Sequence, residues 1–138
     1  MAYITAALQL IQSYLAGKGW FDAVTIGEPD GPPSTPAAAI FLTTGTASQL
    51  TTTTFRRQRE VTVRIYMDVS TEPREQAEME LDKMVYDAEA AFKTDLNLSS
   101  TGWIISPGTD IAETFDYVML GNRPFRTADI VLPLTQRE

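Results

Sequence analysis

The sequence predicts an α+β fold: a mostly antiparallel sheet covered on one face by two helices, as a two-layer sandwich. Three observations lead to this expectation. Two segments have the apolar spacing of amphipathic helices, six segments have the character of strands, and short turn-rich connections join several of these strands. With 138 residues, the chain is expected to form a single domain over residues 1–138.

The first element is expected to be a helix, because apolar residues recur at i, i+4, i+7 and i+11: Ile4, Leu8, Ile11 and Leu15. Gly17 is expected to end this helix in a left-handed conformation. Residues 23–28 are interpreted as a short strand, and a proline-rich loop follows over residues 29–33. The apolar segment 37–42 is interpreted as a buried strand, although its alanines would also suit a turn of helix.

Residues 43–54 contain seven threonines and few apolar side chains. We expect a flexible loop or an exposed hairpin tip here. The β-branched content would let the segment extend as a strand if a partner supplied an edge. Four of its residues are predicted to contact a partner: Thr44, Gln49, Leu50 and Thr52.

The segment 55–69 carries the clearest strand pattern, with apolar residues at every second position from Val61 to Val69. Residues 70–73 supply a helix cap and a proline suited to a first helical turn, so a long helix is expected from Glu72 to about Thr94. Its acidic residues are expected on the solvent side.

Three further strands are expected at the end of the chain, over residues 102–106, 114–120 and 125–134. The last two are joined by a turn at residues 121–124. Pro133 has no backbone N–H to donate, so the final strand is expected at an edge of the sheet.

The composition excludes several kinds of site. The chain has no Cys and no His, which removes disulfides, typical zinc sites, Cys nucleophiles and the Ser-His-Asp triad. The net charge of −7 disfavours broad binding to nucleic-acid phosphates. No apolar stretch is long enough to cross a bilayer. The composition therefore favours a binding or structural protein over an enzyme, and we expect no cofactor, no metal and no membrane partner.

Acidic residues leave one catalytic alternative open. Asp110, Glu113 and Asp116 lie close together near the start of a predicted strand. Such a group could serve a small carboxylate-dependent hydrolase or hold a hard cation such as Mg²⁺ or Ca²⁺, although no EF-hand spacing is present. Acidic residues at strand ends more commonly face solvent.

Arginine is distributed unevenly, since four of the eight arginines fall between residues 56 and 64: Arg56, Arg57, Arg59 and Arg64. One interpretation is a sheet margin that charge protects from edge pairing. The other is a surface that pairs with an acidic partner. Arg123 and Arg126, which flank Pro124 and Phe125, form a second such pair.

The layout of the chain resembles that of a known family. An N-terminal amphipathic helix leads to a strand ending in Gly27-Glu28-Pro29, and a Thr-rich segment leads into the strand from Arg59 to Met67. A long helix opens near Glu75 and runs to Phe92, and the chain closes with the segment from Gly121 to Ile130. In size and order of elements this is similar to the tail-terminator (tail completion) proteins of long-tailed bacteriophages.

The resemblance implies a structural protein of the virion, located at the end of the tail near the neck and assembled in the host cytoplasm. It would form a homo-oligomeric ring, with six subunits expected, that caps the tail tube protein, ends tube polymerisation and joins the tail to the head–tail connector protein. DNA would pass through the lumen without specific binding. A head–tail connector or neck protein of the same virion region is the nearest alternative.

A ring needs two unlike complementary surfaces on each subunit. The sequence offers a basic set of interface candidates, namely Arg56, Arg57, Arg59, Arg64, Arg123 and Arg126. It also offers an acidic set on the long helix, namely Glu75, Glu78 and Asp82. Pairing of the two sets between neighbouring subunits is our hypothesis at this stage.

Overall fold

The computed structural model describes residues 3–49, 55–69, 74–106 and 110–137. Over these residues the chain forms two α-helices, a short 3₁₀ helix and six strands. In chain order the elements are α1 (Thr5–Lys18), β1 (Ala23–Ile26), β2 (Ala37–Gln49), β3 (Phe55–Asp68), α2 (Arg74–Thr94), η1 (Ser99–Thr101), β4 (Ile104–Ile105), β5 (Ala112–Leu120) and β6 (Arg123–Arg137). Within the described residues, neither helix is long and apolar enough to cross a membrane.

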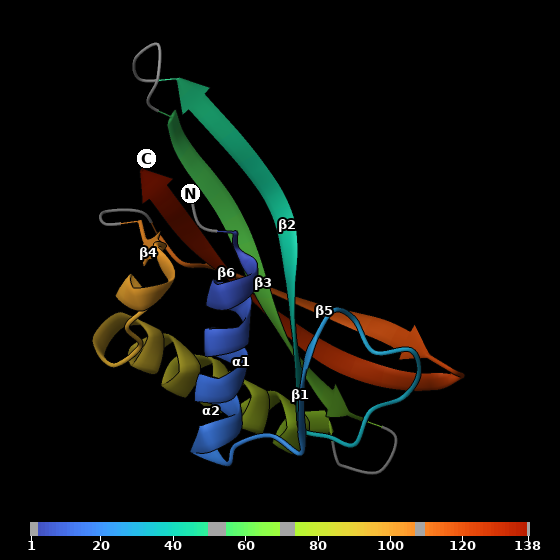
Figure 1. The fold of residues 1–138 in the computed structure, drawn as a ribbon. Coiled ribbons are helices and arrows are strands. Elements are labelled where there is room, and N and C mark those ends of the chain that lie inside the picture. Colours follow the sequence, from blue (N-terminus) through green and yellow to red (C-terminus); the bar gives the residue numbers. More distant parts are fainter. Residues whose placement is uncertain (1–2, 50–54, 70–73, 107–109, 138) are drawn as a thin grey trace.

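The six strands form one mixed, curled sheet with the order β1-β2-β3-β6-β4, and β5 pairs with β6 beside β4 (Figure 1). The β1–β2 pairing is parallel, and the other four pairings are antiparallel. The predicted α+β class and the predicted order of helices and strands are thereby confirmed. The parallel β1–β2 pair is a feature that the sequence did not predict.

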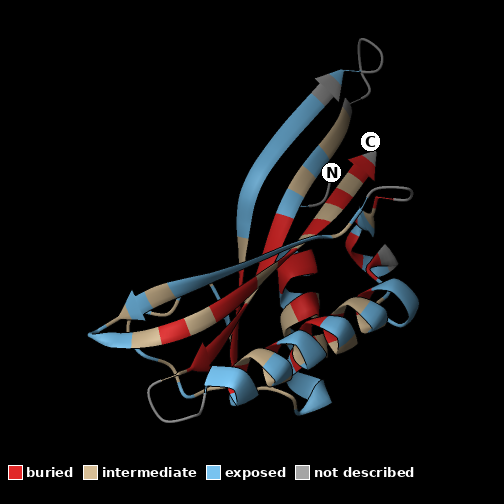
Figure 2. Ribbon diagram, turned by 180° about the vertical axis from the view of Figure 1, so that it is seen from behind, coloured by how far each residue is buried: buried red, intermediate tan, exposed pale blue. Residues whose placement is uncertain are grey.

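Both helices pack against the same face of the sheet, where the main core lies (Figure 2). Of the predicted stripe of α1, Leu8, Ile11 and Leu15 are buried, whereas Ile4 is the half-buried N-cap residue just before the helix. The apolar stripe of α2 is buried at Ala77, Leu81, Val85, Ala88 and Phe92. Both stripes meet the alternating apolar residues of β3 and β6, with Trp103 at one end of the core. Helix α1 runs past Gly17, and Gly19 is the residue that adopts the left-handed conformation after it, with φ of 73°.

The opposite face of the sheet carries a second, smaller cluster. Tyr66 and Phe125 are almost fully buried here, with ring centroids 6.3 Å apart in an edge-to-face arrangement. Val118 and Leu120 of β5 pack against them, and Val118 is the cross-strand partner of Phe125. Apolar side chains are therefore also buried on the face of the sheet that the helices do not cover.

The position of Pro133 corrects one prediction. The last strand, β6, is central: β3 pairs with one edge, and β5 and β4 share the other. The carbonyl oxygen of Pro133 accepts a hydrogen bond from the backbone N–H of Ser106, on the β4 side. In a strand, the N and C=O of one residue point to the same edge. The missing N–H of Pro133 therefore falls on the Ser106 side, past the end of β4 at Ile105, so the β3–β6 ladder loses no donor at this residue.

Candidate functional site

The most prominent feature outside the core is an extended arm, which we define as residues 43–49 of β2 and residues 55–60 of β3. Figure 1 shows these strands rising past the ends of both helices. The predicted loop is therefore strand up to Gln49, and Thr44 and Gln49 lie exposed on β2. Leu50 and Thr52 lie outside the described residues. A shift in register between Leu42 and Thr44 marks a bulge at the base of the arm, which redirects the strand there.

Arg59 lies flat against the helix-facing side of the arm. Its Nη1 donates to the carbonyl oxygens of Gln58 at 2.9 Å and Thr46 at 3.3 Å, and its guanidinium lies 6.0 Å from the centre of the Trp103 ring. Gly45 is the cross-strand neighbour, and a Cβ there would lie 2.8 Å from Cδ of Arg59. The missing side chain of Gly45 therefore makes room for the arginine.

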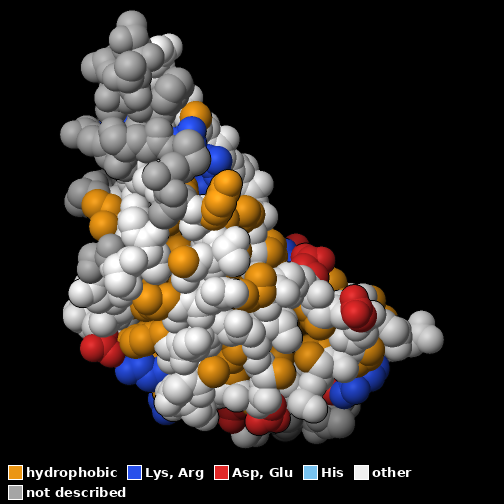
Figure 3. Space-filling model, in the orientation of Figure 1, with side chains coloured by type: hydrophobic (Ala, Val, Ile, Leu, Met, Phe, Trp, Pro, Cys, Tyr) orange, Lys and Arg blue, Asp and Glu red, His pale blue; other side chains and the backbone are white. Residues whose placement is uncertain are grey.

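Arg56 lies on the opposite face of the arm, because it is an odd number of residues away from Arg59 along the strand. Its Nε is buried and has no hydrogen-bond partner among the described residues. Arg57 is engaged in a contact within the chain. Over the described residues, neither Arg56 nor Arg59 forms an ion pair with a carboxylate. On the face shown in Figure 3, basic side chains lie on the arm, and no acidic side chain is seen beside them.

Arg64, in contrast, is held within the chain. Its Nε and Nη2 donate to the two carboxylate oxygens of Asp129 at 2.7 and 3.0 Å, and its Nη1 donates to Glu28 at 2.8 Å. The guanidinium also lies 5.1 Å from the centre of the Phe41 ring. The hydrogen bonds that Arg64 donates to Asp129 hold the pKa of the guanidinium above its usual value, so the charge is permanent. This residue joins β3, β6 and the segment after β1.

The second arginine pair is also bound internally. Arg123 forms an ion pair with the buried Asp68, at the point where β6 begins. Arg126 binds Glu78 of α2, with Nε 2.5 Å from the carboxylate, and its guanidinium lies 4.5 Å from the centre of the Tyr117 ring. The structure thus divides the six arginine candidates: three have carboxylate partners in the chain, and two of those on the arm have none among the described residues.

The acidic candidates on α2 are divided in the same way. Glu78 is occupied by Arg126, whereas Glu75 and Asp82 are exposed. The sequence did not single out Glu89, which is the α2 carboxylate that meets β5. It shares a hydrogen bond with Glu113, and burial followed by this contact raises the pKa of Glu89 to about 7. Helical spacing places Glu78, Asp82 and Glu89 along one side of α2. Only the register of β5 shows that Glu113 is the acidic residue that lies opposite Glu89.

The predicted acidic group near residue 110 does not come together as a ligand cluster. Alternation along β5 puts Glu113 on the helix-facing side and Asp116 on the other side. Among the described residues, no group of three or more Asp or Glu side chains could hold a metal ion. Asp116 instead accepts a hydrogen bond from the backbone N–H of Tyr117 at 2.8 Å.

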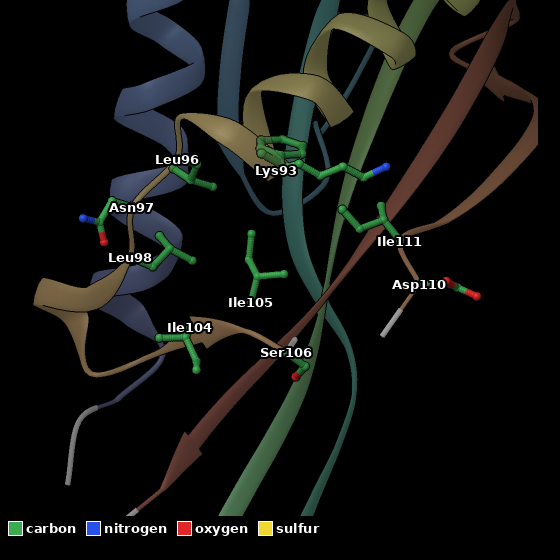
Figure 4. Close-up of a pocket in the computed structure, with 10 residues that line it drawn as sticks. Lys93, Leu96, Asn97, Leu98, Ile104, Ile105, Ser106, Asp110 and Ile111 are labelled. Carbon is green, nitrogen blue, oxygen red and sulfur yellow. The ribbon is translucent and has the colours of Figure 1, made fainter. Parts of the chain in front are cut away.

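A hollow of about 430 Å³ lies between the end of α2, β4 and the start of β5 (Figure 4). Leu98, Ile105 and Ile111 point toward one another in it, and the carboxylate of Asp110 points away. Ser106, at its edge, is hydrogen-bonded to Thr135. The hollow is thus lined by aliphatic side chains together with polar and charged ones, including Lys93, Asn97 and Ser106.

The sequence matches no protein-family model and no curated protein. The candidate site therefore consists of what the geometry singles out: the arm with its three arginines, and the exposed strand β5 with its acidic residues.

Proposed function

We propose that the chain is a tail-terminator protein of a long-tailed bacteriophage, and that it caps the tail tube as a ring. In this role it ends polymerisation of the tube protein and joins the tail to the head–tail connector. The proposed role is structural and not enzymatic. The proposed location is the virion, at the end of the tail near the neck.

The arm is the observation that carries the proposal. Residues 42–47 of β2 are all exposed, so the folded chain gains little burial from ordering them. Proteins generally keep exposed edge strands short or cover them, because a free strand edge can pair with another chain. An arm of this length is therefore best explained by a neighbouring subunit that covers it.

The charges support a head-to-tail arrangement. The arm carries arginines that have no carboxylate among the described residues, and α2 and β5 carry acidic residues at the other end of the sheet. Heterologous contacts between unlike surfaces close into a ring when the rotation from one subunit to the next divides a full turn evenly. We further propose that the subunit contributes to the ring as a two-layer sandwich, with the mostly antiparallel sheet as one layer and the two helices as the other.

The net charge of −7 suits a lumen through which DNA slides. An acidic surface gains nothing from releasing the counterions around phosphates, so DNA would pass without being held. This part of the proposal concerns the assembled ring only, and it requires that a neighbour covers the arginines on both faces of the arm.

Electron microscopy of the purified protein mixed with tail tubes of the phage that encodes it tests the proposal. We expect ring-shaped density at one end of each tube, and tubes of defined length when the protein is added during tube polymerisation. A tube population without end density and without length control would refute the proposal. Density found on the head connector alone would favour the neck-protein alternative.

A further inference from the structure

The outer edge of β2 is unpaired along the arm. Strand β1 pairs only with Ala37 to Ile40, and from Leu42 to Gln49 the described residues place a strand on the β3 side alone. The N–H and C=O groups on the outer edge are therefore open to pairing. This edge, which we call the β2 edge, has no charged side chain and no proline between residues 42 and 49.

The outer edge of β5 is also unpaired. This strand is nine residues long and pairs with β6 alone among the described strands. Most of its side chains are exposed, including the large apolar residues Phe115, Tyr117 and Met119. We call this second surface the β5 edge. The two edges are similar in length and lie at different ends of the molecule (Figure 1).

We propose that the β2 edge of one copy pairs with the β5 edge of the next copy, so that the sheet continues from subunit to subunit. This inference rests on the proposed function, since it names the contact that builds the ring. Main-chain hydrogen bonds would supply the affinity, as in other cases of strand addition.

The charges on both faces of the sheet fit this pairing. In a continuous sheet, residues on one face of a strand meet residues on the same face of the next strands. With β2 and β5 parallel and Gly45 opposite Glu113, Arg59, which lies one strand further in on β3, would approach Glu113 on the helix-facing side. On the opposite side, Arg56 would approach Asp116. Each face thus brings an arginine without a described carboxylate partner toward an acidic residue.

The same charges disfavour symmetric pairings. Two β5 edges side by side would bring the acidic residues of both copies together, next to the Glu89–Glu113 contact that already exists within one chain. Two β2 edges would bring the arginines of both arms together. Like charges opposite each other in a sheet are destabilising, so pairing of unlike edges is preferred.

Cysteine cross-linking tests the pairing directly, because the chain has no native Cys. Thr46 and Thr114 are exposed on the two edges. We expect the double variant Thr46→Cys/Thr114→Cys to give a ladder of oligomers with a short bismaleimide. An equal mixture of the two single variants should give dimers, and neither single variant alone should cross-link. The double variant Thr46→Cys/Ser13→Cys, with its second cysteine on the exposed side of α1, is the matched control and should stay monomeric on denaturing gels.

The outcomes separate this inference from the proposed function. Dimers of Thr46→Cys alone, or of Thr114→Cys alone, would show a symmetric contact and overturn the inference. Absence of the ladder would also overturn it, whether the protein is a monomer or a ring by native mass measurement. A ring without the ladder would leave the terminator proposal intact, whereas a ladder without end density on tail tubes would leave only the strand pairing.

A charge exchange supplies an independent readout. We expect Arg56→Glu and Asp116→Arg each to weaken association about tenfold, and the double variant to recover most of the loss. Glu60→Gln removes an acidic charge from the same face of the arm, so it should leave association unchanged or tighten it. Far-UV circular dichroism and urea unfolding show whether each variant is folded. Equal additive losses in the double variant would refute the proposed approach of these two residues.

Discussion

Replacement of Arg64 tests whether the arginines divide into structural and assembly residues. In Arg64→Met, the aliphatic stem is kept and the guanidinium is lost, which removes two hydrogen bonds to Asp129 and one to Glu28. The two carboxylates then remain near each other without their common cation. We expect a lower free energy of unfolding and no specific effect on assembly of the folded subunit.

The magnitude follows from the exposure of the pair. The side chains of Arg64 and Asp129 are 25% and 22% exposed, between a surface pair and a fully buried one. Breaking a buried pair costs roughly 3–5 kcal/mol, and an exposed pair contributes about 0–1 kcal/mol. We therefore expect Arg64→Met to lower the free energy of unfolding by about 2 kcal/mol, which corresponds to a urea midpoint about 1 M lower.

A double-mutant cycle with Asp129→Asn isolates the pair, since both changes remove the charge and retain much of the shape. Urea unfolding of the four proteins, followed by circular dichroism at low protein concentration, gives the coupling free energy. We expect a coupling of about 1–2 kcal/mol. Additive losses, with a coupling below about 0.5 kcal/mol, would refute the assignment of Arg64 to the fold. A loss of association in folded Arg64→Met would return it to the interface.

Other predictions concern the acid pair, the arm and the second core. Because the pKa of Glu89 rises from 4.5 to about 7 on folding, the folded state binds a proton more tightly than the unfolded chain. Stability should therefore fall as pH rises from about 4.5 to 7 and be lower at pH 8, and Glu89→Gln should flatten this dependence in urea midpoints measured across that range. Gly45→Ala should displace Arg59 and lower the melting temperature, and Arg59→Ala in the same chain should remove most of the effect of the new methyl group; an equal effect in both backgrounds would contradict the packing described for the arm. Phe125→Ala should cost roughly 3–5 kcal/mol by urea unfolding although no helix covers this residue, and a loss under 1 kcal/mol would mean that the second cluster is not a core.

Local patterns predicted the elements of this fold well. The spacing of Ile4, Leu8, Ile11 and Leu15 identified α1, and strict alternation from Val61 to Val69 identified β3, because both patterns depend only on the geometry of one element. The ends of elements were harder to place. Residues 43–49 have the composition of a loop, but pairing with β3 extends them as strand. This is tertiary context overriding composition, as is common for strands.

The candidate site was predicted only in part. The sequence showed the cluster of arginines before β3 and the acidic side of α2, but not which charges meet. Arg64 pairs with a residue 65 positions away, and Arg126 pairs with one 48 positions away. Nothing local encodes such a partner. The register of the sheet decides it, and so does the curl that brings β5 toward α2.

The sequence by itself determined the class of fold, the order of helices and strands, and the side chains available for chemistry, because periodicity and composition are properties of neighbouring residues. Only the tertiary structure decided that β1 runs parallel to β2, that Pro133 fits a central strand, and that Glu89 meets Glu113. It also decided which arginines pair with a carboxylate within the chain, and which arginines of the arm have no such partner among the described residues. Each of these depends on the register between segments that are distant in the chain, and a shift of one residue would send every side chain of a strand to the other face.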